Sequence, residues 1–115
     1  MSPEAIVAFF HARRFPLTDE KILQARIAEC LVKENIEHER EVRLAPGDIV
    51  DFMIGGVAIE VKIGGRKRSI YDQCERYCEH ERVEALVLAT SVAMGFPPEI
   101  KGKPCYVASL GRGWL

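Results

Sequence analysis

The chain has 115 residues, of which 48% are apolar and 29% are charged, and its net charge is −1. This length predicts a single domain over residues 1–115, and the composition is that of an ordinary globular protein. The near-zero net charge excludes a surface that attracts nucleic acid everywhere, so a polyanion would need a local basic patch. No apolar run is long enough to span a membrane and the start lacks the pattern of a signal peptide, which predicts a cytoplasmic protein.

Two helices are expected at the start of the chain. Ser2 has the character of an N-cap and is followed by a proline at the first helical position, which predicts a helix over about residues 3–13. Thr18 is the expected cap of a second helix over roughly 19–35, where apolar residues recur with helical spacing.

Strands dominate the middle and the end of the sequence. The last predicted helix begins after Ser69, where Ser-Ile-Tyr-Asp resembles a capping box. The expected strands cover residues 38–44, 48–54, 57–63, 84–90 and 104–110, and the expected helix between the third and fourth covers about 70–81. The order is α, α, β, β, β, α, β, β, which predicts an α/β domain with a mixed β-sheet flanked by helices.

The stretch "GDIVDFMIGGVAIEVKIGG" (47–65) predicts a β-hairpin with three charged residues in an otherwise apolar context. A two-residue Gly-Gly turn would set the register so that Asp51 lies opposite Glu60, with their Cβ atoms roughly 4.5–5.5 Å apart. Alternation then places Lys62 on the same face and Val50 on the opposite, apolar face. Facing carboxylates repel, and a hard divalent cation with its preference for oxygen ligands would offset that repulsion.

An alternative for the hairpin is a solvated strand face that carries a surface salt bridge.

The four cysteines, Cys30, Cys74, Cys78 and Cys105, lack the paired spacing of a disulfide framework or a zinc site, which favours reduced thiols.

Asp51 followed by "IEVK", with Glu60 and Lys62, resembles the PD-(D/E)XK nuclease superfamily, which has the restriction-endonuclease-like fold. The predicted order α-β-β-β-α-β from residue 19 to about 90 is similar to the core of that family. The proline expected before the aspartate is absent, because Val50 stands there. Gln73 and Tyr77 also resemble the Gln-x-x-x-Tyr motif of RecB-type nucleases, and their spacing puts them on one face of a helix.

The resemblance implies a metal-dependent nuclease that hydrolyses DNA phosphodiester bonds, in repair, recombination or phage DNA processing. It implies that Asp51, Glu60 and the Val61 carbonyl hold one or two Mg²⁺ or Mn²⁺ ions, that Lys62 acts at the attacked phosphate, and that Gln73 orients either Lys62 or the nucleophile. The family often adds an acid from the first core helix, and Glu29 is the candidate because it is the polar member of the stripe Ile22, Ala25, Glu29, Val32. A stripe-edge glutamate that reaches water is the alternative.

Basic residues near the hairpin are the candidate DNA contacts. Arg66, Lys67 and Arg68 form a glycine-led loop, and Arg76 could extend it; a solvated loop is the alternative. Arg112 and Trp114 could contact nucleic acid or close the core.

Two other functions remain open on the sequence: a non-catalytic nucleic-acid-binding or assembly domain that retains the nuclease fold, and an α/β domain with no nucleic-acid role. A small nuclease that cuts both strands needs two sites, which predicts a homodimer. The sequence does not separate endonuclease from exonuclease action or DNA from RNA.

Overall fold

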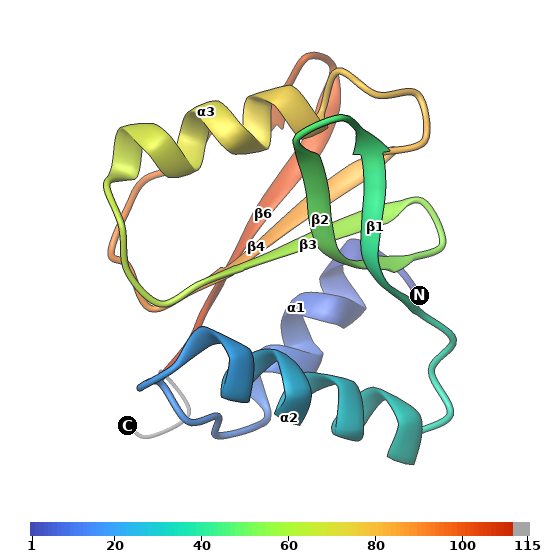
Figure 1. Ribbon diagram of the computed structural model, residues 1–115, viewed down its shortest axis with the longest axis vertical. Coiled ribbons are helices and arrows are strands. Elements are labelled where there is room, and N and C mark those ends of the chain that lie inside the picture. Colours follow the sequence, from blue (N-terminus) through green and yellow to red (C-terminus); the bar gives the residue numbers. More distant parts are fainter. Residues whose placement is uncertain (112–115) are drawn as a thin grey trace.

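Three helices and six strands make up residues 1–111, the part of the chain that this computed structural model describes (Figure 1). Arg112 and Trp114 lie outside the described residues. Over residues 1–111 no helix has the length and apolar character needed to cross a bilayer. The elements are α1 (Pro3–His11), α2 (Glu20–Lys33), β1 (Glu39–Ala45), β2 (Asp48–Ile54), β3 (Val57–Lys62), α3 (Lys67–Tyr77), β4 (Ala85–Thr90), β5 (Glu99–Ile100) and β6 (Lys103–Ser109).

The strands form one mixed sheet in the order β1-β2-β3-β4-β6-β5. β1, β2 and β3 are antiparallel neighbours, β3, β4 and β6 run parallel, and the two-residue strand β5 is antiparallel to β6. The predicted mixed α/β class is therefore confirmed. β5 was not predicted, because two residues are too few to show a strand periodicity.

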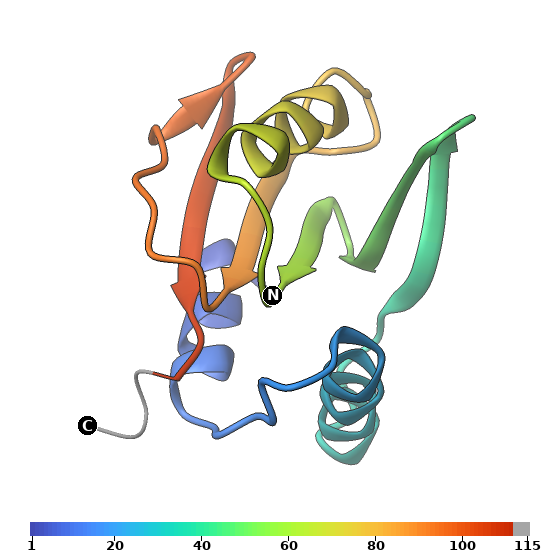
Figure 2. The ribbon, with the colours of Figure 1, turned by 60° about the vertical axis from the view of Figure 1, so that its left-hand side comes forward.

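Helices cover both faces of the sheet, and each face has its own apolar cluster (Figures 1 and 2). α1 and α2 bury a cluster that includes Phe10, Leu23 and Ile27 against one face. α3 buries Ile70 and Tyr77 against the other face. The central strands are consequently apolar on both sides, as expected for parallel strands between helices.

Two helices begin at residues other than those predicted. Asp19, rather than Thr18, caps α2, because its carboxylate accepts a hydrogen bond from the Ile22 amide at 3.0 Å. α3 begins at Lys67 after Arg66, which makes no side-chain capping bond, so Ser69 lies inside the first turn and the predicted capping box is wrong. The helix also ends at Tyr77 instead of residue 81.

The hairpin register is confirmed close to its turn and ends before the two acids. Ile54 pairs with Val57 and the ladder continues only as far as Phe52 opposite Ile59. Asp51 is therefore not a ladder partner of Glu60, contrary to the prediction. Beyond that point β2 departs from simple alternation: Phe52 packs with α1 and α2, whereas Val50, which was predicted on the same face, packs with α3.

The departure coincides with an unusual backbone conformation in β1. Glu41 has φ +50°, a left-handed backbone that non-glycine residues rarely adopt. Glu41 lies between the residues of β1 that pair with Phe52 and Val50, and so stands opposite Asp51. Asp51 lies beyond the end of the β2–β3 ladder, and its carboxylate instead bonds to β3 through the Val61 amide.

Candidate active site

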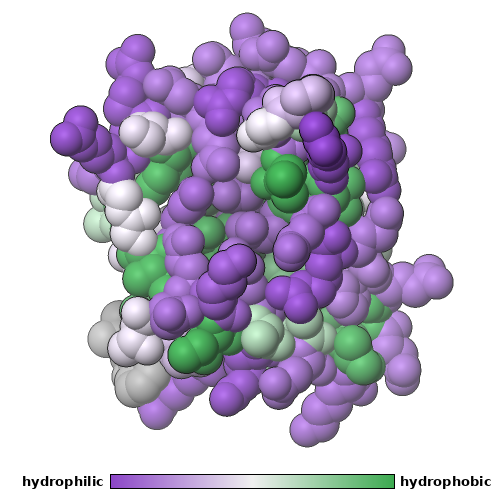
Figure 3. Space-filling view, in the orientation of Figure 1, coloured by the Kyte–Doolittle hydropathy of each residue, from purple (hydrophilic) through white to green (hydrophobic). Residues whose placement is uncertain are grey.

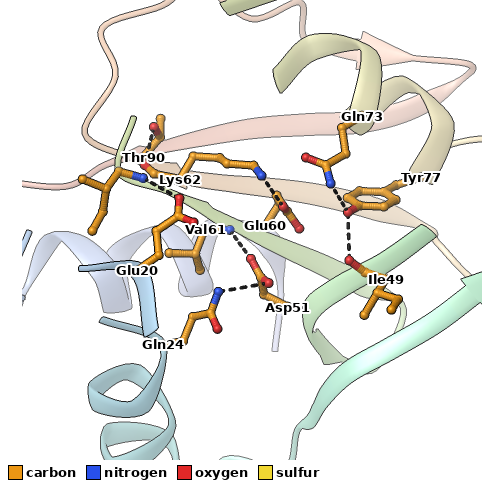
Figure 4. Close-up of polar contacts among 11 residues, drawn as sticks. Glu20, Gln24, Ile49, Asp51, Glu60, Val61, Lys62, Gln73, Tyr77 and Thr90 are labelled. Atoms are coloured by element: carbon orange, nitrogen blue, oxygen red, sulfur yellow. Dashed lines mark hydrogen bonds and ion pairs between the residues drawn. The ribbon is translucent and has the colours of Figure 1, made fainter. Parts of the chain in front are cut away.

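Polar side chains from α2, β2, β3 and α3 converge near the end of β3 (Figure 4). They are Glu20, Gln24, Asp51, Glu60, Lys62, Gln73 and Tyr77. The β2–β3 hairpin brings Asp51 and Glu60 close together. α2 and α3 contribute their side chains from opposite faces of the sheet. Four of the seven were predicted as catalytic residues, and the structure brings all four of these, Asp51, Glu60, Lys62 and Gln73, to the same region.

Asp51 spans the gap between β2 and β3 with its side chain. Its Oδ2 accepts a hydrogen bond from the Val61 amide at 2.8 Å, and its Oδ1 accepts one from Gln24 Nε2 at 3.2 Å. Burial raises the pKa of the Asp51 carboxyl, the Val61 bond and the Lys62 charge oppose that rise, and the charge of Glu20 adds to it. The two groups that hold Asp51 in place, the Gln24 and Val61 amides, are both neutral. They therefore do not compensate the negative charge of the buried carboxylate.

Glu60 is buried, with 3% of its side chain exposed, and forms an ion pair with Lys62 at 3.2 Å. Its Oε1 is the one buried side-chain oxygen or nitrogen in residues 1–111 that has no hydrogen-bond partner. Burial and the nearby charge of Asp51 raise the pKa of Glu60 to about 8, and the Lys62 charge only partly opposes this. An unpartnered buried carboxylate oxygen costs free energy, so stability alone does not account for Glu60.

Glu20, and not the predicted Glu29, is the acid that α2 contributes to the site. Glu20 Oε1 accepts a hydrogen bond from the Ile63 amide at 2.9 Å, and the charge of Glu20 raises the pKa of Asp51. Glu29 is 73% exposed and pairs with Arg26. Glu20 and Gln24 share a helix face, whereas Glu29 lies about 140° around the helix from Gln24 at about 100° per residue.

The prediction for Glu29 was wrong because it relied on the stripe Ile22, Ala25, Glu29 and Val32, which is not the face of α2 that packs on the core. Leu23, Ile27 and Leu31 are the residues that face the core. The stripe that was predicted to be buried is exposed, with Ile22 at 54% and Val32 at 66%. Figure 3 shows the resulting apolar patches along the outer side of α2.

Gln73 and Tyr77 lie on one face of α3, and together they link that helix to β2. Gln73 Nε2 donates to the Tyr77 hydroxyl at 2.7 Å, and that hydroxyl donates to the Ile49 carbonyl at 2.8 Å. Tyr77 is fully buried, and burial together with the charge of Glu60 raises the pKa of its hydroxyl. The pair therefore positions β2 against α3 beside Glu60, and a supporting role of Tyr77 in the site stays a prediction.

Thr90 holds the backbone at Lys62, and no sequence motif predicted this contact. Its hydroxyl is buried and donates to the Lys62 carbonyl at 2.7 Å. It also accepts a hydrogen bond from the Val92 amide at 3.0 Å. Thr90 and Gln24 contribute through contacts between distant segments, which no local motif contains.

The basic loop, Arg66, Lys67 and Arg68, is a loop only in part: Arg66 is the N-cap of α3, and Lys67 and Arg68 lie in the first turn of that helix, contrary to the prediction. All three residues are exposed, and Arg68 forms a surface pair with Asp72. The structure does not bring Arg76 to this loop: it lies about 12 Å along the helix from Arg68 and pairs with Asp48 at 3.1 Å. His80 and Arg76 both bond to the Asp48 carboxylate and lower its pKa, and these two bonds fasten the start of β2 to the end of α3.

The donor set fits a hard divalent cation in its chemistry. The acids Asp51, Glu60 and Glu20 supply carboxylate oxygens, and the Asp51–Val61 bond brings the Val61 main chain to them. Over residues 1–111 no three or more His, Cys, Asp or Glu side chains are already arranged as a metal-binding group. The unpartnered Glu60 oxygen nevertheless leaves an acceptor available, and Mg²⁺ or Mn²⁺ prefers such oxygens to the thiols and imidazoles favoured by softer metals.

No protein-family model, curated protein or solved structure matches this chain.

Proposed function

We propose that this chain is a metal-dependent nuclease with a restriction-endonuclease-like core, which hydrolyses phosphodiester bonds in DNA. The observation that carries the proposal is Glu60: a buried carboxylate with an unpartnered oxygen, beside Asp51 and paired with Lys62. The order α2-β1-β2-β3-α3-β4 supports it at the level of the fold. A structural salt bridge would leave no buried oxygen without a partner.

The residues divide into roles by their position. Asp51, Glu60 and the Val61 carbonyl would hold Mg²⁺ or Mn²⁺, with Glu20 close by on α2. A bound ion would supply an acidified water and offset phosphate charge. Lys62 is half-buried, its ammonium pairs with Glu60 and its backbone carbonyl accepts a hydrogen bond from Thr90. Its positive charge would stabilise the negative charge that develops on a phosphate bound beside Glu60.

A non-catalytic nucleic-acid-binding domain is the second candidate function. The exposed basic loop would serve that function equally well. The buried acids favour the nuclease, because two carboxylates with raised pKa values cost stability that a binding surface does not require. The homodimer and the cytoplasmic location stay predictions.

Cleavage assays on labelled DNA test the proposal. Wild-type protein with Mg²⁺ or Mn²⁺ is incubated with duplex, single-stranded, flap and four-way-junction DNA, with circular plasmid and with RNA. We expect cleavage that EDTA stops and that Lys62→Met abolishes, whereas Arg26→Ala, a change of the exposed pair on the outer side of α2, leaves it intact. Binding without cleavage of any substrate would favour the second candidate function.

The two α2 acids give a sharper test of the metal site. Glu20→Gln should weaken Mn²⁺ binding several-fold, because the carboxylate beside Asp51 loses its charge. Glu29→Gln is the matched control, since its side chain is exposed and pairs with Arg26. Titration calorimetry measures both affinities. Equal losses in the two variants would remove Glu20 from the site.

The basic loop should bind phosphates without reading sequence. Changing Arg66, Lys67 and Arg68 together to alanine should weaken DNA binding and reduce the slope of log affinity against log salt by up to about 3, roughly one for each phosphate contact. Arg76→Ala should leave the slope unchanged, because Arg76 pairs with Asp48. An unchanged slope in the triple variant would mean that the loop is only solvated surface.

A further inference from the structure

Two buried thiols face each other away from the candidate active site. Cys78, the C-cap residue of α3, and Cys105 on β6 place their sulfur atoms 3.8 Å apart, although 27 residues separate them in sequence. Both are free thiols, with 1% and 7% of the residue exposed. Cys105 pairs with Leu86, near the start of β4, whereas Lys62 pairs with Thr90 at the end of that strand. The thiols therefore have no part in the chemistry proposed above.

The two sulfurs differ in their surroundings. The hydrogen bond with Cys105 and the charge of Lys103 lower the pKa of Cys78, while the same bond and burial raise the pKa of Cys105. Lys103 is held at this place by a hydrogen bond from its ammonium to the His80 carbonyl. Cys78 is thus the sulfur that ionises more readily, and a thiolate is the form that reacts with oxidants.

The short edge strand β5 lies beside β6 in the sheet and pairs with Lys103 and Pro104, just before Cys105. The Cys105 amide bonds to the Pro98 carbonyl, which precedes β5, at 2.9 Å. Short edge elements with few hydrogen bonds open at low free-energy cost. A small oxidant therefore has a route to these sulfurs through local opening of the edge.

We propose that Cys78 and Cys105 form a reversible intramolecular disulfide when the protein meets hydrogen peroxide, which fastens the end of α3 to β6. The Cys78 sulfur attacks one peroxide oxygen, the O–O bond breaks, and a sulfenic acid and one water form. The Cys105 sulfur then displaces the hydroxyl group as a second water, and the S–S bond forms. Two thiols are oxidised and one peroxide is reduced.

Formation of the disulfide requires only a small movement of the two sulfur atoms. An S–S bond is about 2.05 Å long, so the sulfurs must approach by less than about 2 Å, which side-chain rotation can supply. The bond would close a loop that contains β4 and β5, and this limits the freedom of the unfolded chain. In a reducing compartment the pair stays as thiols, so the bond would report an oxidising challenge. The proposal holds whether or not the chain cleaves DNA.

The test treats the full chain with hydrogen peroxide, blocks remaining thiols with an alkylating agent, and maps the peptides by mass spectrometry without reduction. We expect one linked pair, Cys78 to Cys105, with the mass of two hydrogens lost. The melting temperature should rise by about 10 °C and return when dithiothreitol is added. Cys78→Ser and Cys105→Ser should each lose both effects, and Cys30→Ser, which lies outside the pair, should keep them.

Alkylation mapping on the wild type keeps the test decisive if a serine variant does not fold. If Cys78 and Cys105 both remain alkylated after oxidation, the proposal is overturned. A bond from Cys74 to either of them, or cross-linked chains joined through Cys30, would overturn it as well.

Discussion

Asp51→Asn should abolish DNA cleavage while leaving the metal-free protein at least as stable as the wild type. The asparagine keeps an oxygen that can accept the Val61 amide, and Gln24 can turn its amide to meet the new NH₂ group. The change removes one of two neighbouring carboxylates whose pKa values are both raised. Removal of the buried Asp51 charge, and of its repulsion of Glu60 wherever both are ionised, should add about 0.5–1 kcal/mol to the free energy of unfolding.

The response of the melting temperature to Mg²⁺ distinguishes a metal-binding role of Asp51 from a purely structural one. Saturating Mg²⁺ should raise the melting temperature of the wild type by mass action and that of Asp51→Asn much less. Thermal melts in EDTA and in Mg²⁺ measure both effects. Asp48→Asn is the matched control on the same strand: it loses its pairs with Arg76 and His80, so it should lose stability but keep cleavage and the Mg²⁺ response.

A destabilised Asp51→Asn variant, together with a wild-type melting temperature that does not change with Mg²⁺, would contradict metal binding at this site. It would favour the interpretation of Asp51, Glu60 and Lys62 as a salt-bridged strand face.

The order of helices and strands was predictable because each long element carries its own periodicity. The hairpin was predictable near its turn, since Gly55 and Gly56 allow a two-residue connection and so fix Ile54 opposite Val57. That register predicted Asp51 near Glu60 and Lys62, but it wrongly placed Asp51 directly opposite Glu60, because the ladder ends at Phe52 and Ile59. Gln73 and Tyr77 followed from helix spacing, although their link to the Ile49 carbonyl did not.

Features that depend on tertiary contacts were not predictable. The β2–β3 ladder ends at Phe52, before Asp51, and the left-handed backbone of Glu41 stands opposite Asp51 on β1; no local pattern predicted either feature. α2 carries apolar residues on two stripes, and the sheet buries the one that leaves Glu20 at the site and Glu29 in solvent. Arg76 looked like a phosphate contact in sequence, yet its partner Asp48 is 28 residues away.

Glu60→Gln should remove most of the pH dependence of stability in the metal-free protein. In the wild type, burial and the charge of Asp51 raise the pKa of Glu60 from 4.5 to about 8. Between these values the folded protein keeps a proton that the unfolded chain has released. The stabilisation is complete below pH 4.5 and is lost as the pH rises through about 8. The free energy of unfolding should fall over this window by on the order of 5 kcal/mol.

Glutamine has no proton to lose, so the Glu60→Gln variant should lack the largest part of this fall. A smaller decline should remain, because the pKa of Asp51 is also raised and Asp51 is still present. Urea denaturation in EDTA at several pH values from about 5 to 8 measures the slope for each protein. Glu29→Gln should keep the wild-type slope, since Glu29 is exposed and pairs only with Arg26 at the surface. If the wild type gained stability as the pH rose, or if Glu60→Gln kept the full slope, Glu60 would be an ionised partner of Lys62 in the metal-free protein. Its carboxylate would then already be compensated, and the reason to expect a cation beside it would be lost.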